Sequence, residues 1–455
     1  MIPRLVIAGA ASGVGKTTIT AGVVAALRSR GLRVQPFKCG PDYIDPSYHA
    51  VAAGVPCRNL DTWMISKEAL LDLFARATRS ADIAIVEGVM GFYDGRNGLE
   101  EAGSTAEIAK TLDAPVILIL NVDKTARSAG AMALGYKEFD RNVRLAGVIL
   151  NRTGSQNHLR WTKEAVEAAT GIPVVGYLPK NADLHLPERH LGLVPTSEGG
   201  EMIQRIGSIR QQVEATVDVD KLITICRAAP VLEWPNSAGL FLLHDEGSRI
   251  RLAVARDEAF SFYYEDNLDI LRAWGAEIVF VSPVHDSQLG DVDGLYVGGG
   301  FPEVYAAQLS ENRSFIHSIR MLAEAGLPIY AECGGLMYLS EGIVDFEGSR
   351  YPMVGLVPGW SQMQSKRVRM GYVSVEALAD SILANKGQEL RGHEFHWSQL
   401  QSFDGKAAYR VVGGDRVDGF AERNILASYV HLHFGTDVSL ARRLIAACEA
   451  WRSKR

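Results

Sequence analysis

The sequence predicts an α/β protein made of two doubly wound domains whose sheets are mainly parallel. Two observations lead to this prediction: short apolar segments alternate with helical stretches in both halves of the chain, and a glycine-rich turn follows a strand in each half. A length of 455 residues suggests two or three domains, at roughly 150 residues per domain. We expect domains at residues 1–196 and 249–455, joined at 197–248 by a linker with helices of its own.

The first half alternates strand-like and helical segments. The helix after the first strand is marked best, because Ile19, Val23 and Leu27 recur every four residues and Gly31 is suited to terminate it. Six apolar segments are expected to be parallel strands: Arg4–Ala10, Arg33–Lys38, Asp82–Glu87, Pro115–Asn121, Leu145–Asn151 and Pro173–Leu178.

The second half repeats this alternation and then changes character after Gly348. Four segments are expected to be parallel strands: Ile250–Arg256, Glu277–Ser282, Leu295–Gly298 and Pro328–Cys333. Shorter strand-like segments with few helices between them follow, and we expect them to be antiparallel strands at the end of a parallel sheet: Val354–Val357, Arg367–Val375, Arg391–Trp397, Tyr409–Val412 and Ile425–Phe434.

Composition argues against several classes of protein. The formal net charge of −6 disfavours a nucleic-acid binder that relies on bulk positive charge. No apolar run approaches the ~20 residues of a membrane span, and the N-terminus lacks a signal-peptide pattern. The five cysteines are widely spaced without a zinc-type pattern, so we expect a protein of the reducing cytoplasm.

A variant phosphate loop lies between the first strand and the first helix, in the segment Gly9–Thr18. Ala10 stands where the strict Walker pattern has glycine, but Gly13 and Gly15 still allow backbone N–H groups to surround phosphates. Lys16 can reach the β and γ oxygens, and the helix N-terminus favours an anion. A glycine-rich turn without a ligand is the alternative, which the order of strand, loop and helix disfavours. Candidate nucleotide-binding residues are Gly13, Gly15, Lys16, Thr17, Thr18 and, at a later strand end, Asn151.

Carboxylates at strand ends supply a candidate metal and substrate site. The carboxyl ends of parallel strands share one edge of the sheet, so these side chains can converge there. For Mg²⁺ we predict the ligands Thr17, Asp45 and Glu87, since a phosphate-loop site uses a hydroxyl and a strand-end carboxylate. Asp42 and Asp94 are further candidates, although acids beside Pro or Gly are also common in turns. Asn151 either contacts the nucleotide base or caps its strand.

Cys333 lies in a strand–turn–helix segment, Pro328–Leu339, that is typical of a nucleophile elbow. A thiol at a helix N-terminus is exposed and its pKa is lowered. The Gly334 N–H can donate to an oxyanion, and the glycine-rich strand end containing Gly299 and Gly300 can supply another backbone donor. A small buried cysteine is the alternative.

A thiol nucleophile needs a base, and two pairs of histidines are available. His431 and His433 are two residues apart, so on a strand they point to one face. We favour His431 as the base and His433 as orienting group or substrate contact. His393 and His396 are a rival source of the base. A metal site built from these histidines is disfavoured, because no cysteine or carboxylate cluster completes it at characteristic spacing.

With these motifs identified, the N-terminal half resembles dethiobiotin-synthetase-like P-loop enzymes. The C-terminal half resembles class I glutamine amidotransferase domains of the cobyrinate/cobyric-acid type. In this order, over nearly the whole chain, the two halves resemble the cobyrinate a,c-diamide synthase family. The segments that carry the resemblance are Gln35–Pro46, Arg58–Asp61, Glu87–Gly91, Leu186–Leu193 and His431–Phe434.

The resemblance implies a P-loop NTPase-like domain followed by a flavodoxin-like class I amidotransferase domain. It implies amidation of the c and a acetate carboxylates of cobyrinate or a related tetrapyrrole, with ATP, Mg²⁺ and L-glutamine. Asp42, Asp45, Glu87 and Asp94 would serve the Mg·ATP and carboxylate site, and Cys333 would be the glutaminase nucleophile. Most class I amidotransferases have Glu two residues after the histidine that aligns with His431. His433 stands at that position here, so its part in a catalytic triad is left open. Whether the protein forms a homodimer is also left open.

Two alternatives to this function are weighed. A nickel-sirohydrochlorin a,c-diamide synthase is close in sequence. A P-loop switch ATPase with a non-catalytic amidotransferase module belongs to a different class, and Ala11 counts against it because such ATPases have a signature lysine there. Under the favoured reading, ammonia has to pass between the two sites as the neutral base, so we expect a shielded path.

Overall fold

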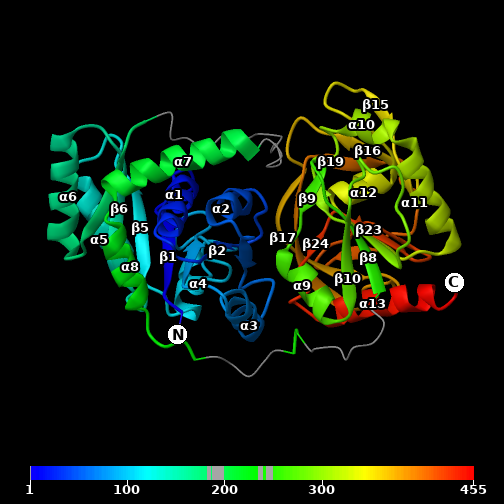
Figure 1. The fold of residues 1–455 in the computed structure, drawn as a ribbon, viewed down its shortest axis with the longest axis horizontal. Helices are drawn as coiled ribbons and strands as arrows, with labels where there is room; N and C mark the ends of the chain where they lie inside the picture. Colours follow the sequence, from blue (N-terminus) through cyan, green and yellow to red (C-terminus); the bar gives the residue numbers. More distant parts are fainter. Residues whose placement is uncertain (1, 182–185, 187–198, 234–238, 242–249) are drawn as a thin grey trace. The chain divides into compact units, whose positions relative to one another are not determined.

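The computed structural model describes residues 2–181, 186, 199–233, 239–241 and 250–455. Within these ranges the chain divides into two compact units, one containing the described residues up to 233 and the other those from 239 onward (Figure 1). Each unit contains a sheet with parallel strands flanked by helices, which confirms the predicted α/β class with two mainly parallel domains. No described helix has the length and apolar character needed to cross a membrane.

The first unit is built on a parallel sheet, which has seven strands in the described part of the chain. Their spatial order is β3-β2-β4-β1-β5-β6-β7, so β1 lies at the centre, between β4 and β5. Both faces of the inner strands are apolar and buried, as expected for a sheet covered by helices on both sides. The strands are β1 (Arg4–Gly9), β2 (Val34–Cys39), β3 (Arg58–Leu60), β4 (Ile83–Glu87), β5 (Val116–Asn121), β6 (Leu145–Thr153) and β7 (Val174–Pro179).

Several helices of the first unit begin at serine caps that the sequence supplies. The hydroxyls of Ser66, Ser104 and Ser155 each accept a backbone N–H from three residues further along the chain, which satisfies donors that a helix start leaves open. The helices are α1 (Lys16–Ser29), α2 (Asp45–Ala53), α3 (Lys67–Ala77), α4 (Thr105–Thr111), α5 (Ser128–Phe139) and α6 (Gln156–Thr170).

Two further helices, α7 (Gly199–Thr216) and α8 (Val219–Arg227), lie in the segment that we expected to be a linker with helices. They belong to the first compact unit, and α7 runs along α1 (Figure 1). The contact is close, because a Cβ on Gly22 would lie 2.6 Å from Cγ2 of Val213 and 2.8 Å from Cγ2 of Ile209. Both helices therefore complete the first unit, while the boundaries at 196 and 248 stay a prediction.

The second unit is built on a sheet of six described strands in the order β10-β8-β11-β13-β23-β22. All neighbours are parallel except β22, which pairs antiparallel with β23 at the edge. The strands are β8 (Ile250–Ala255), β10 (Ala276–Val281), β11 (Gly294–Val297), β13 (Ile329–Glu332), β22 (Phe420–Glu422) and β23 (Ile425–Ser428), and the helices are α9 (Glu265–Ala273), α10 (Ala306–Glu311), α11 (Arg313–Ala325), α12 (Gly334–Leu339) and α13 (Ser439–Arg452).

Most of the strands expected to be antiparallel at the end of this sheet instead lie in separate sheets. The exception is β23, from the expected strand 425–434, which joins the six-stranded sheet parallel to β13. Among described residues, one of the separate sheets has the order β15-β14-β16-β19, another has the order β21-β20-β17-β18-β24, and β9 pairs with β12. The strands are β9 (Phe260–Phe262), β12 (Gly299–Gly300), β14 (Ser340–Val344), β15 (Arg350–Pro352), β16 (Val357–Met363), β17 (Arg369–Ala377), β18 (Glu389–His396), β19 (Ser398–Gln401), β20 (Tyr409–Val411), β21 (Val417–Asp418) and β24 (His431–Leu432).

Two predicted strands of this region are wrong. The segment 354–357 is strand only from Val357, where β16 begins. The segment 425–434 divides into β23 and β24, because the Tyr429 N–H donates to Asp418 and the Val430 N–H donates to the Ser428 hydroxyl. These side-chain acceptors replace ladder partners and turn the chain out of one sheet into another.

Candidate active sites

The phosphate loop joins the end of β1 to the start of α1. Gly13 and Gly15 have φ of 71° and 93°, a left-handed conformation that favours glycine. Gly15 caps α1 without a side-chain hydrogen bond, so the first-turn N–H groups, which include those of Thr17 and Thr18, are suited to an anion. The loop thus has the backbone geometry that the sequence predicted for phosphate binding.

Lys16 and Asn151 hold this loop. Lys16 Nζ donates to Ala11 O at 3.0 Å and to Met90 O. Asn151 Nδ2 donates to Val14 O at 2.8 Å, and a Cβ on Gly15 would lie 2.3 Å from the same Nδ2 atom. Asn151 therefore braces the loop, and its contact with a nucleotide base stays a prediction.

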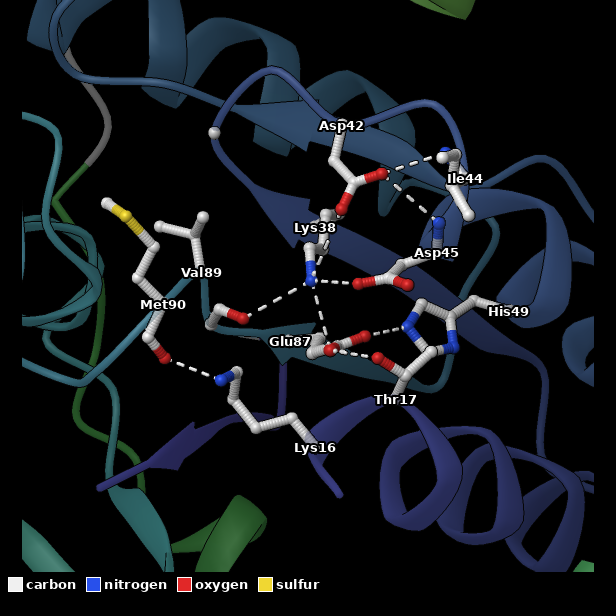
Figure 2. A network of polar contacts seen from close by, with 12 residues as sticks. Lys16, Thr17, Lys38, Asp42, Ile44, Asp45, His49, Glu87, Val89 and Met90 are labelled. Atoms are coloured by element: carbon white, nitrogen blue, oxygen red, sulfur yellow. Dashed lines mark hydrogen bonds and ion pairs between the residues drawn. The ribbon is translucent and has the colours of Figure 1, made fainter. Parts of the chain in front are cut away.

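Predicted site residues from three elements converge beside the loop (Figure 2). Thr17 Oγ1 donates to Glu87 Oε1 at 2.9 Å, at the end of β4. Lys38 Nζ lies 3.0 Å from Glu87 Oε1, 2.5 Å from Asp45 Oδ2 and 3.6 Å from Asp42 Oδ2. We call Thr17, Lys38, Asp42, Asp45 and Glu87 the acid cluster. Asp94 has a different contact: its carboxylate accepts the Gly91 N–H at 2.9 Å.

Sequence reasoning missed two members of this neighbourhood, Lys38 and His49. Lys38 is the one charged residue of β2 and is buried, and His49 Nε2 contacts Glu87 Oε2 in the fully buried interior. A buried charge is costly unless it is paired. A lysine at the end of an otherwise uncharged buried strand was therefore a readable signal for a carboxylate partner.

The acid cluster shifts the pKa values of its members in opposite directions. Burial, together with the negative charge of Asp42, raises the pKa of Asp45 to about 7. Burial alone would raise the pKa of Glu87, but Lys38 and His49 outweigh it and lower the value to about 2. Burial and the neighbouring charge of Lys38 lower the pKa of Lys16 to about 8. Glu87 is therefore a permanent carboxylate, whereas Asp45 and Lys16 titrate near neutrality.

The donor set of the acid cluster fits Mg²⁺. The Thr17 hydroxyl, in the first turn of α1, lies beside a carboxylate oxygen of Glu87 at the end of β4, and Asp45 supplies a second carboxylate on the other side of Lys38. Mg²⁺ takes few protein oxygens and completes its shell with water and substrate phosphate.

Cys333 occupies a strained turn between β13 and α12. Its φ of 49° is unusual for a residue other than glycine and is typical of a functional position. A Cβ on Gly335 would lie 2.3 Å from Val297 O, so only glycine fits there. Cys333 Sγ lies 3.8 Å from Phe395 O, and burial raises the pKa of its thiol, followed by the charge of Glu303. Cys333 is buried, so the predicted exposure of its thiol is wrong, and burial outweighs the lowering of the pKa expected from the helix N-terminus. The thiol therefore needs a base.

The predicted oxyanion donors and His431 surround this turn. A Cβ on Gly334 would lie 3.0 Å from Gly300 N, so the two glycine segments are in contact. A Cβ on Gly299 would lie 2.6 Å from Cε1 and 3.5 Å from Nε2 of His431. The predicted base therefore presents its Cε1–Nε2 edge to the predicted oxyanion strand.

The other histidines have different surroundings. His433 follows β24; its Nδ1 accepts the Gly435 N–H at 3.0 Å, its ring lies 4.8 Å from that of Tyr264, and burial lowers its pKa to about 3. His396 Nδ1 donates to Ser398 O at 2.8 Å. His393 stacks on His431 with ring centroids 4.8 Å apart. Of the predicted histidines, His431 is therefore the one set against the glycine strand.

Comparison with known proteins covers both units. Residues 5–194 match the family model described as the CobQ/CobB/MinD/ParA nucleotide binding domain, and residues 251–438 match the CobB/CobQ-like glutamine amidotransferase domain. A relative in Dehalococcoides mccartyi named cobyrinate a,c-diamide synthase is 51% identical over 97% of each chain. The chain belongs to the cobyrinate a,c-diamide synthase family. A family member of the same name in Archaeoglobus fulgidus is 45% identical over 98% of this chain and 97% of its own. Another in Priestia megaterium is 43% identical over 99% of this chain and 98% of its own.

Membership of the cobyrinate a,c-diamide synthase family confirms the resemblance inferred from the sequence motifs. The nucleotide-binding match contains the phosphate loop and the acid cluster, and the amidotransferase match contains Cys333 and His431. A solved glutamine amidotransferase aligns with 44% of this chain and 98% of its own, at 18% identity and a TM-score of 0.34.

Proposed function

We propose that this chain amidates the a and c acetate carboxylates of cobyrinate, with ATP and L-glutamine as co-substrates. The observation that carries the proposal is similarity over almost the whole chain to relatives named for this reaction, with the nucleotide-binding and amidotransferase domains in one polypeptide. Names of relatives over this length favour cobyrinate over nickel sirohydrochlorin as the tetrapyrrole.

The first half of the reaction makes a carboxylate electrophilic. A carboxylate repels nucleophiles and has a poor leaving group, whereas transfer of the γ-phosphoryl group gives an acyl phosphate that ammonia can attack. Lys16 would leave its carbonyl partners to bind the γ-phosphate. Thr17, Glu87 and Asp45 would hold Mg²⁺, which neutralises phosphate charge when bound. Asp42 and Asp94 would line the side that receives the tetrapyrrole carboxylate.

Lys38 supports this site by balancing charge. Its ammonium lies between Asp45 and Glu87, which keeps both carboxylates in place although they are close to each other. Burial opposes the charged form, but Asp45 and Glu87 together raise the pKa of Lys38 well above its usual value. Lys38 therefore stays cationic and can also attract an incoming carboxylate.

The second half liberates ammonia. Cys333 would attack the glutamine amide, with His431 taking the thiol proton, and the thioester would then be hydrolysed to glutamate. N–H groups of the segments containing Gly299, Gly300 and Gly334 would stabilise the tetrahedral oxyanion. The contacts of His433 with Gly435 and Tyr264 favour a part in holding the turn after β24.

The compartment and assembly complete the proposal. Each of the five cysteines, all within the described ranges, is free, which supports the cytoplasm as the site of the reaction. A homodimer is tested by light scattering on the purified protein.

Replacing the nucleophile tests the proposal. Cys333→Ser should abolish glutamine-dependent amidation of cobyrinate and leave amidation with ammonium salts intact, read as the mass change when a carboxyl OH becomes NH₂. Cys448→Ser, at a buried cysteine of α13, is the matched control and should keep glutamine-dependent activity. Nickel sirohydrochlorin is assayed in parallel. An unmodified tetrapyrrole with every nitrogen donor, despite ATP hydrolysis, would support a switch ATPase instead.

A further inference from the structure

Glu332, the residue immediately before the nucleophile, carries a buried carboxylate that the proposed reaction has not used. It ends β13, and only 1% of the residue is exposed. Its Oε2 accepts the Tyr296 hydroxyl at 2.9 Å, and its Oε1 accepts the Tyr330 hydroxyl and the Leu432 N–H at 3.0 Å. An ionised carboxylate is costly to bury, and three donors fix this one in a single position.

The same carboxylate faces the predicted base. Glu332 Oε2 lies 3.8 Å from His431 Nδ1, and both residues are 1% exposed. Glu332 Oε1 also accepts the N–H of Leu432, the residue after His431. The carboxylate therefore contacts both the ring of the base and the peptide that follows it. The opposite Cε1–Nε2 edge of His431 faces Gly299. One ring nitrogen thus points to a fixed anion and the other toward the oxyanion strand.

We infer that Glu332 is the positioning residue that orients His431 for glutamine hydrolysis. The sequence had suggested His433 for this orienting role. The inference rests on the proposed function. Glu332 favours the tautomer with a proton on Nδ1, which leaves Nε2 to take the proton of Cys333, and it stabilises the imidazolium that results. The Nδ1–Oε2 distance is longer than a hydrogen bond, and such contacts tighten when substrate binds.

Among the described residues, the titratable side chains that lie against the His431 ring include Glu332 from β13 and His393 from β18. His393 contacts the ring face, and burial followed by the charge of His431 lowers its pKa well below the usual value, so it stays neutral. Tyr296 and Tyr330 face Glu332 and remain protonated, since burial raises both of their pKa values. Glu332 is thus the one anion set against the ring among these groups.

Glu332→Gln tests the inference, because the amide preserves shape but removes the charge. We expect kcat for glutamine hydrolysis to fall by about 10²-fold, a typical contribution of a working general base. KM for glutamine should be nearly unchanged, since Glu332 acts through His431. Amidation with ammonium should be unchanged, and Glu332→Asp should recover part of kcat. The dependence of kcat/KM for glutamine hydrolysis on pH should also change, because a charge beside the base is removed.

Controls separate this role from a structural one. Asp293→Asn removes another buried carboxylate of the same unit, which accepts the Arg251 N–H at 2.7 Å, and should leave glutamine hydrolysis unchanged. Tyr296→Phe keeps the Glu332 carboxylate and should retain most activity. Equal loss of glutamine- and ammonium-dependent turnover in Glu332→Gln, an unmoved pH profile, or full glutaminase activity would each overturn the inference. Failure of the wild-type protein to amidate any tetrapyrrole would instead overturn the proposed function.

Discussion

At the scale of single residues, the lysines beside the phosphate loop depend on one another. Burial and the neighbouring ammonium of Lys38 together lower the pKa of Lys16 to about 8. Lys16 must be charged to bind phosphate oxygens well, so the affinity of the free protein for ATP should weaken as the pH rises through about 8.

A change at Lys38 checks this dependence. Lys38→Met removes the positive charge that, after burial, lowers the pKa of Lys16. The pH midpoint for loss of ATP affinity should therefore move upward. Equilibrium titration with ATP between neutral and alkaline pH measures both midpoints. Lys180→Met, which breaks an exposed ion pair with Asp123, serves as the control and should leave the midpoint in place. An unmoved midpoint in Lys38→Met would show that the two ammonium groups are not coupled.

Asp45 makes the stability of the fold depend on pH. Its pKa is about 7 in the folded chain and near the ordinary 3.8 when unfolded, so between these values the folded state binds more protons. The free energy of unfolding contributed by Asp45 should therefore be largest below pH 3.8 and decline as the pH rises toward about 7. Asp45→Asn should flatten this decline in urea titrations from pH 5 to 8; an unchanged slope would contradict the raised pKa.

At the scale of elements, α7 is part of the first unit although its sequence is charged and follows the last strand. Gly22 in α1 lets α7 approach, since a Cβ there would lie 2.6 Å from Val213. Gly22→Ala should reduce the free energy of unfolding by about 1–3 kcal/mol through overpacking. Gly135→Ala, at an exposed position of α5 where an added Cβ would have no atom within 4 Å, should instead raise it by roughly 0.5–1 kcal/mol. Denaturant unfolding compares them, and equal effects would contradict close packing of α7.

The sequence could predict those elements whose signal is local, and it missed those that depend on length or on more distant contacts. Apolar runs such as Val116–Asn121 are typical of buried parallel strands. The phosphate loop and the Cys333 turn have characteristic spacings within one short segment, so the local sequence predicts them. The three-residue strand β3 is too short for a periodic signal. The break between β23 and β24 depends on Asp418, which is distant enough in sequence that no local pattern reveals it.

The candidate sites divide in the same way. The convergence of Thr17, Asp45 and Glu87 could be predicted because the segments at the carboxyl ends of parallel strands meet at one edge of the sheet. The partnership of Glu332 with His431 joins residues about a hundred positions apart, so only the folded chain brings it into view. The sequence pattern of related domains pointed instead to His433, whose contacts lie with Gly435 and Tyr264.

At the scale of the whole molecule, the two activities have to be joined by ammonia. Neutral ammonia is the nucleophile, yet near neutral pH bulk water would protonate most of it, so release to solvent would waste the product of glutamine hydrolysis. We therefore predict that nitrogen from glutamine reaches the tetrapyrrole without mixing with solvent ammonium. With amide-¹⁵N glutamine and an excess of unlabelled ammonium, the product should carry mainly ¹⁵N. Cys333→Ser should incorporate only unlabelled nitrogen under the same conditions. A wild-type product whose label matches the composition of the bulk solution would show that ammonia diffuses freely.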